Sequence, residues 1–274
     1  MLDEYFLRSC SPLSCARTLR SLPLVPTDGA PFLVPNWLWA NDTRLFWPDE
    51  TGVSFCNRDE CISVNHLGVD ASSMGFAADE NEAFFDGAAA CDLDDCASTY
   101  RKLEPSLPTG EPPLDGSIVT ALDEDYLYQY QFVGSRIVRF KKDGTGEVQV
   151  IARDQFDVPG IAVRDGHVYW TEYVSLGRLL RCPVTGCAGD PEVVASRLDH
   201  PTALALDADY VYFEEPDPPG SANSQLGTRH ISKCAITGCV TPERLTENGA
   251  LSAPFVDDRS IYFLGIDYIA AVSK

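Results

Sequence analysis

The chain has 274 residues, of which 45% are hydrophobic, 23% charged and 10% aromatic, so disorder is excluded as its main state. No stretch approaches the ~18 apolar residues that a transmembrane helix needs, which excludes a membrane-spanning helix. With 21 basic and 41 acidic residues the net charge is −20, and nucleic acids and anionic lipids, which are bound through Lys and Arg, are therefore poor partners.

A short motif recurs six times along the chain: a polar residue, three variable residues and then an apolar–aromatic pair. In chain order the copies read NDTRLFW, DENEAFF, DEDYLYQ, RDGHVYW, DADYVYF and DDRSIYF, and they begin at positions 41, 79, 123, 164, 207 and 257. The steps between them are 38, 44, 41, 43 and 50 residues. Such a regular period is the sequence signature of a repeat architecture.

Each copy lies in a unit of four short strands that are rich in Val, Ile, Tyr and Phe and separated by Gly, Pro and Asp turns. No window shows a sustained helical period. Four-stranded units of about 40–50 residues predict an all-β, six-bladed β-propeller with antiparallel blades, in a single domain over 1–274. The expected repeat units lie near 31–70, 71–110, 111–155, 156–198, 199–248 and 249–274.

The N-terminal segment, 1–30, is expected to close the ring. The sixth unit reaches Lys274 without a fourth strand, and ARTLRSL, directly after Cys15, has the character of one. We therefore expect this strand to complete the last blade. YFLRSC before it resembles a further third strand, so either Met1–Cys10 pairs at the edge of that blade or a seventh blade is truncated.

The ten cysteines form five C-x4-C pairs with none left over. A four-residue turn between paired strand residues places two Cα atoms within the disulfide range of about 4.4–6.8 Å. Zinc is the less favoured alternative, because the pairs are far apart and the four histidines are unpaired; reduced thiols are another. The predicted disulfides are Cys10–Cys15, Cys56–Cys61, Cys91–Cys96, Cys182–Cys187 and Cys234–Cys239.

This density of disulfides indicates an oxidising compartment, so we expect a secreted, periplasmic or cell-surface protein. The first residues, MLDEYFLRSC, contain Asp3 and Glu4 and lack the apolar core of a signal peptide. We expect the true start to lie upstream; export that is signalled otherwise is the alternative.

The segment GIAVRDGHVYWTEYVSLGRLLRCPVTGC, over 160–187, resembles the YWTD- and NHL-type six-bladed propellers, with VYWTE at the place of their YWTD-like signature. LLRCPVTGC and ISKCAITGC resemble cysteine-flanked repeats of secreted, uncharacterised proteins of myxobacteria. The resemblance covers about 31–274 and weakens in the first two units, where AFFDG replaces VYWTE. It implies a TolB-like propeller that serves as a binding or scaffold module, and it transfers no catalytic residue.

In a propeller, the loops that enter each innermost strand share one face with the loops that join strands two and three. The cysteine turns lie on the opposite face, so function is expected on the cysteine-free face, where loops on a rigid scaffold can vary. Clustered carboxylates there suit calcium, although no calcium-loop spacing is present and solvated loop carboxylates are the simpler account. The candidate ligand-face residues are Asp157, His200, Glu172, Glu214, Glu215 and Asp217.

Two kinds of aromatic side chain have competing interpretations. His200 could act as a base, but its sequence context offers no acid partner that can be placed, so a loop role is favoured. The tryptophans could form a ligand platform, but their positions in strands favour packing between blades. They are Trp37, Trp39, Trp47 and Trp170.

Searches for G-x-S-x-G, H-E-x-x-H, G-x-G-x-x-G and Walker patterns find none. We therefore expect a non-catalytic binding or scaffold propeller, exported and monomeric, that engages a protein or carbohydrate ligand through the cysteine-free face. No cofactor is expected, with calcium left open. The alternatives are a metal-dependent lactonase-like or lyase-like propeller enzyme and a structural envelope component.

Overall fold

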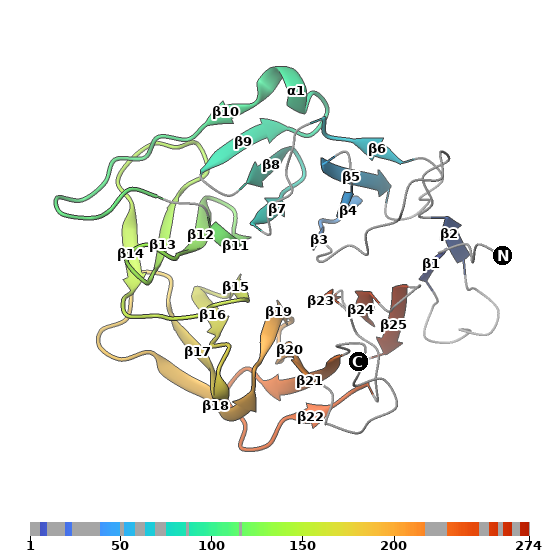
Figure 1. The fold of residues 1–274 in the computed structure, drawn as a ribbon, viewed down its shortest axis with the longest axis vertical. Coiled ribbons are helices and arrows are strands. Elements are labelled where there is room, and N and C mark those ends of the chain that lie inside the picture. The colour runs from blue at the N-terminus through green and yellow to red at the C-terminus, as the bar shows by residue number, and fades with distance from the viewer. Residues whose placement is uncertain are drawn as a thin grey trace.

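The computed structural model describes residues 6–9, 20–23, 39–49, 52–57, 64–68, 75–85, 88–114, 117–216, 229–246, 252–256, 260–264 and 269–273. Six of the seven sheets in the described residues are arranged around a common centre, each with its first strand innermost and its last toward the rim (Figure 1). This is the arrangement of a β-propeller, and it confirms the all-β fold of four-stranded antiparallel blades.

Five blades have four strands each, hydrogen-bonded in sequence order from the centre outward. The first two are β3 (Trp39–Ala40), β4 (Arg44–Asp49), β5 (Gly52–Asn57) and β6 (Asn65–His66), then β7 (Phe76–Ala78), β8 (Glu82–Phe85), β9 (Ala89–Asp92) and β10 (Arg101–Lys102), with α1 (Cys96–Thr99) between β9 and β10. The third and fourth are β11 (Ser117–Leu122), β12 (Tyr126–Gln131), β13 (Arg136–Lys141) and β14 (Gln149–Ala152), then β15 (Ile161–Arg164), β16 (His167–Thr171), β17 (Ser175–Pro183) and β18 (Glu192–Asp199). The fifth is β19 (Thr202–Leu206), β20 (Tyr210–Pro216), β21 (Arg229–Ala235) and β22 (Glu243–Arg244).

The prediction of six four-stranded blades closed by an N-terminal strand is wrong. The sixth sheet has three strands, β23 (Ser252–Val256), β24 (Ser260–Leu264) and β25 (Ile269–Ser273). The expected closing strand, β2 (Arg20–Pro23), pairs instead with β1 (Phe6–Ser9) in a separate two-stranded sheet. β1 lies beside β25, but among the described residues no ladder joins them. Pairing with a neighbour in sequence closes a short loop, and its entropic cost is lower than that of reaching a strand at the other end of the chain.

In four blades the polar residue that opens the repeat stabilises the first hairpin. Asp207 Oδ1 accepts hydrogen bonds from the backbone N–H groups of Asp209 and Tyr210, both at 2.8 Å. The same Asx-turn pattern forms at Asn41, Asp79 and Asp123. The fourth blade makes this turn with Asp165 and Gly166 at φ values of 48° and 72°, as a two-residue hairpin loop requires.

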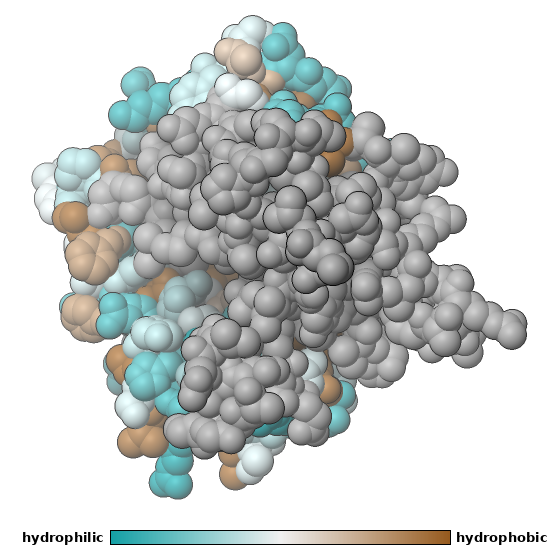
Figure 2. Space-filling view, turned by 45° about the vertical axis from the view of Figure 1, so that its right-hand side comes forward, coloured by the Kyte–Doolittle hydropathy of each residue, from teal (hydrophilic) through white to brown (hydrophobic). Residues whose placement is uncertain are grey.

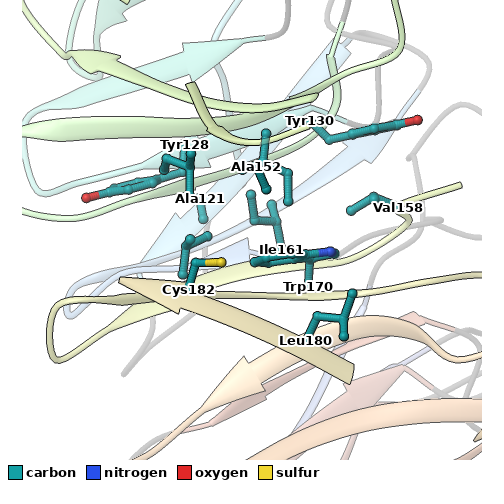
Figure 3. Packing of buried hydrophobic residues seen from close by; sticks show 12 residues of the cluster. Ala121, Tyr128, Tyr130, Ala152, Val158, Ile161, Trp170, Leu180 and Cys182 are labelled. Carbon is teal, nitrogen blue, oxygen red and sulfur yellow. The ribbon is translucent and has the colours of Figure 1, made fainter. Parts of the chain in front are cut away.

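The hydrophobic core is divided into layers between neighbouring blades. Figure 3 shows the layer between the third and fourth blades, where Tyr128 and Tyr130 of β12 face Ile161 and Trp170 of the next blade. Trp170 is fully buried, and its indole N–H donates to Gln155 Oε1 at 2.9 Å. Trp47 is buried and Trp39 packs against the layer of the first two blades, which supports the packing role; Trp37 lies outside the described residues.

Three of the five predicted disulfides are confirmed, and each joins the third strand of a blade to the segment that follows it, which begins the helix α1 in the second blade and is a turn in the fourth and fifth. Cys91–Cys96, Cys182–Cys187 and Cys234–Cys239 have Cα–Cα distances of 4.8, 5.2 and 5.6 Å. Cys10, Cys15 and Cys61 lie outside the described residues, so the pairs Cys10–Cys15 and Cys56–Cys61 stay predictions.

In the fourth and fifth blades, the turn between the third and fourth strands also binds the blade to the one before it. The Cys187 N–H donates to the Ile151 carbonyl of β14, and the Cys239 N–H donates to the Val194 carbonyl of β18, both at 3.0 Å. Gly186 and Gly238, which precede the second cysteine, have φ values of 110° and 105°, which explains the TGC sequence in both turns. In the described part of the chain no helix has the length and apolar character to cross a membrane.

Candidate functional site: the cysteine-free face of the third to fifth blades

The structure brings most of the sequence-predicted face residues into one band of loops. Asp157 precedes β15 and His200 precedes β19, while Glu172 follows β16. Glu214 and Glu215 lie near the end of β20, directly after the repeated motif. Asp217 lies outside the described residues. The five described positions are at the ends of the sheets opposite the disulfides.

Backbone hydrogen bonds hold these loops against one another. The Tyr173 N–H donates to the Asp157 carbonyl at 2.8 Å, and the His200 N–H donates to the Val174 carbonyl at 3.2 Å. Arg229 Nη2 then donates to the His200 carbonyl at 2.6 Å. The entry loops of the fourth and fifth blades are therefore connected through the loop after β16.

Two of the candidate carboxylates form hydrogen bonds that hold these loops in place. Glu172 accepts two hydrogen bonds from Arg178, at 2.6 and 2.7 Å. Glu215 accepts from the Asp199 N–H at 3.0 Å and from Ser232 Oγ at 3.2 Å. Within the described ranges no group of three or more His, Cys, Asp or Glu side chains is placed to hold a metal ion. The carboxylates of Glu172 and Glu215 thus position loops.

Glu214 is buried, with 3% of its surface exposed, whereas the sequence placed it on the ligand face. Its Oε2 accepts a hydrogen bond from Thr202 Oγ1 at 3.1 Å and lies 3.5 Å from Arg229 Nε, but its Oε1 has no hydrogen-bond partner. Burial raises the pKa of this carboxyl above its ordinary value, and the Arg229 charge and the Thr202 hydrogen bond oppose that rise.

We expect the variant Glu214→Gln to change how stability depends on pH. A carboxyl whose pKa is raised on folding binds its proton more tightly in the folded state, so its contribution is most favourable at low pH and declines as pH rises through the folded pKa. The free energy of unfolding of the wild type, relative to Glu214→Gln, should therefore fall as the pH rises above about 4.5, the ordinary pKa of a glutamate. Urea unfolding at several pH values measures this difference; a constant or rising difference would contradict it.

His200 has the acid partner that sequence analysis could not place: its immediate neighbour. His200 Nδ1 and Asp199 Oδ1 are 2.6 Å apart, and the ring meets that of Tyr173 edge-on at 5.1 Å between centroids. The His200 side chain is 38% exposed. A histidine oriented by a carboxylate and open to solvent has the geometry of a general base.

The feature that sequence analysis missed is a set of large hydrophobic side chains exposed on this same face. Phe132 and Val133 form the turn after β12, Phe156 precedes β15, and three more follow β16. Figure 2 shows brown hydrophobic residues among hydrophilic ones on the described surface, rather than a uniformly polar shell. The six side chains on this face have exposed fractions of 66% for Phe132, 51% for Val133, 61% for Phe156, 44% for Tyr173, 41% for Val174 and 71% for Leu176.

These hydrophobic side chains, which we call the apolar band, are carried by constrained backbone. The Gln155 N–H donates to the Ser135 carbonyl at 2.8 Å, which ties the segment before Phe156 to the turn after β12. Leu176 is a non-glycine residue at a φ of 62°, and Asp157 has a φ of 47°. Left-handed backbone at such residues costs free energy and persists only where the surroundings impose it, typically at functional sites.

The fold and this face define a β-propeller with a loop surface opposite its disulfides, and comparison with known proteins agrees on the fold. No protein-family model and no curated protein sequence matches the chain. Among solved structures, streptogramin B lyase is similar with a TM-score of 0.61 and 15% identity over 94% of this chain and 84% of that one. The nidogen/laminin complex is similar with a TM-score of 0.52 and 12% identity, covering 98% of this chain and 87% of that one. At these identities the likeness shows the fold alone.

Proposed function

We propose that this chain is an exported, non-catalytic binding propeller that engages a protein partner through the apolar band on its cysteine-free face. The observation that carries the proposal is the gathering of six exposed hydrophobic residues on the third and fourth blades, five on loops and one, Leu176, at the start of β17. Exposed apolar patches framed by polar residues mark interaction sites, and aromatic residues are enriched in protein interfaces.

Three other features support this proposal. The three disulfides fit an oxidising, extracellular compartment. The band is tied together by backbone hydrogen bonds, so little conformational entropy is lost when a partner binds. A propeller of similar fold occurs in a complex of two proteins, nidogen and laminin, which gives an analogy for protein binding and no more.

The test begins with recovery of the partner and continues with purified components. Phe156→Ala and Leu176→Ala should each weaken the affinity for the purified partner by about tenfold, because truncating a buried interface anchor costs more than about 1 kcal/mol. Val240→Ala is the matched control, since Val240 is 98% exposed on the opposite, disulfide-bearing face. Calorimetry gives the dissociation constants and thermal unfolding verifies folding. Equal affinities for all three variants would overturn the assignment of the band.

A catalytic function is the second candidate, and the pairing of His200 with Asp199 is the observation that favours it. The similar fold of streptogramin B lyase directs the choice of substrates. Turnover of streptogramin B or of simple lactones above background, lost in His200→Ala but kept in His167→Ala, would overturn the non-catalytic proposal. Because His167 lies at the start of β16 on the opposite face, it provides a matched histidine control.

A further inference from the structure

A cavity of about 490 Å³ lies between the first and second blades, on the side of the molecule that carries the disulfides. It is far from the apolar band, which belongs to the opposite face and to other blades. Its volume is within the range of about 300–1,000 Å³ that is usual for small-molecule sites. Its lining includes Arg44, Phe55, Asn65, His66, Leu93 and Asp94.

The wall of this cavity offers a hydrogen-bond donor that the protein itself leaves unused. Arg44 Nη2 donates to Asp94 Oδ1 at 2.8 Å, while Arg44 Nη1 is buried and has no hydrogen-bond partner. A buried guanidinium N–H without a partner is costly and calls for an acceptor such as a ligand oxygen. Arg44 lines the cavity, so an oxygen of a bound ligand would be such an acceptor.

The neighbouring polar groups both donate and accept. Asn65 is exposed, and its amide provides donors and an acceptor. The Asp94 carboxylate is 89% exposed and accepts, so beyond its bond from Arg44 it has further acceptor capacity. Hydroxyl groups are the ligand groups that match such a set, because each one donates and accepts.

The charge of the cavity wall and its apolar residues further limit the class of ligand that can bind. Asp94 and Asp95 outnumber Arg44 at the wall, in a chain of net charge −20, so an anionic ligand is disfavoured. Phe55 and Leu93 also line the cavity, but Leu93 is 3% exposed and the Arg44 guanidinium lies over the Phe55 ring, 5.3 Å from its centroid. The apolar part of the wall is therefore small, and polar groups carry the recognition. We propose that this cavity binds a neutral saccharide of one or two sugar units.

The walls are fixed before any ligand arrives. The Cys91–Cys96 disulfide closes the loop that carries Leu93 and Asp94, and the Asp92 N–H donates to Thr99 Oγ1 at 2.9 Å across it. On the other wall, His66 Nδ1 and Ser54 Oγ are 2.6 Å apart. A preorganised wall lowers the entropic cost of binding.

The experiment is a saccharide titration of the full-length protein, followed by saturation-transfer NMR and calorimetry. The probes are glucose, galactose, mannose, N-acetylglucosamine and their common disaccharides, with glucuronate as the anionic comparison. We expect at least one neutral sugar to bind, and Asn65→Ala and Asp94→Asn each to weaken it by about tenfold. Asn57→Ala and Asp125→Asn are the matched controls, because both residues are exposed and neither lines the cavity.

Binding of a neutral sugar that is weakened by the two cavity variants, and by neither control, supports the proposal. No binding at millimolar sugar, equal binding by all variants, or preference for glucuronate would overturn it. The result is independent of the proposed protein partner: Phe156→Ala should leave sugar binding unchanged, and Asn65→Ala should leave partner binding unchanged.

Discussion

Removal of the three confirmed disulfides, by replacing both cysteines of each with alanine, should lower the free energy of unfolding by about 6 kcal/mol. Each bridge joins residues five positions apart, and the loop-entropy account assigns about 2 kcal/mol to a ring of that size. Guanidinium unfolding measures the loss. It should appear as a lower midpoint of the transition, with little change in slope.

The same experiment done one bridge at a time provides its control. The bridges lie in different blades, so each double replacement should cost about 2 kcal/mol and the costs should add. A total loss below about 2 kcal/mol for all three would show that these bridges do not stabilise the native state, which would also weaken the argument for an oxidising compartment.

Replacement of Arg136 by alanine is expected to cost about 3 kcal/mol, because it breaks a buried ionic contact and leaves a void. The Arg136 side chain is fully buried and forms an ion pair with Glu111. Its Nη2 also donates to the Pro112 carbonyl at 2.6 Å. It therefore fastens the segment that crosses from the second to the third blade, and its loss leaves that carbonyl unpaired.

The matched control for Arg136→Ala is Arg164→Ala. Arg164 lies 3.4 Å from Asp165 in an exposed pair, and such pairs contribute about 0–1 kcal/mol. Chemical unfolding of both variants, with the wild type alongside, gives the comparison. Similar losses for the two would contradict the assigned role of Arg136.

Most of the fold could be predicted from the sequence because the determinants are local and repeat. The Asx turns at Asp123 and Asp207, the Asp165–Gly166 turn and the C-x4-C hairpins each depend on neighbours within a few residues. Ring closure could not be predicted in the same way. It depends on whether β2 pairs with β1 or with β25, and the pattern of apolar residues in a short strand suits either partner.

The candidate site was only partly predictable, because on this face several polar side chains are buried while neighbouring aromatic side chains are exposed. Gln131 is fully buried, while Phe132 next to it is 66% exposed. The same inversion occurs at Gln155 and Phe156, which are 6% and 61% exposed. Sequence analysis assigns carboxylates to the surface and aromatic residues to the core, so it selected Glu214, which is buried, and passed over Phe132 and Phe156.

The three confirmed disulfides all lie within single blades, and this has a consequence for how the ring can open. Among the described residues, neighbouring blades are joined by hydrogen bonds such as that from Cys239 to Val194, by ion pairs such as Lys142–Asp79 and Arg44–Asp94, and by side-chain packing. Each of these three blades is thus linked covalently to its neighbours by the main chain and not by its disulfide. Under mechanical load the ring could part at a seam and reseal without any thiol chemistry. Gain or loss of one such blade during evolution would likewise leave the other confirmed disulfides intact.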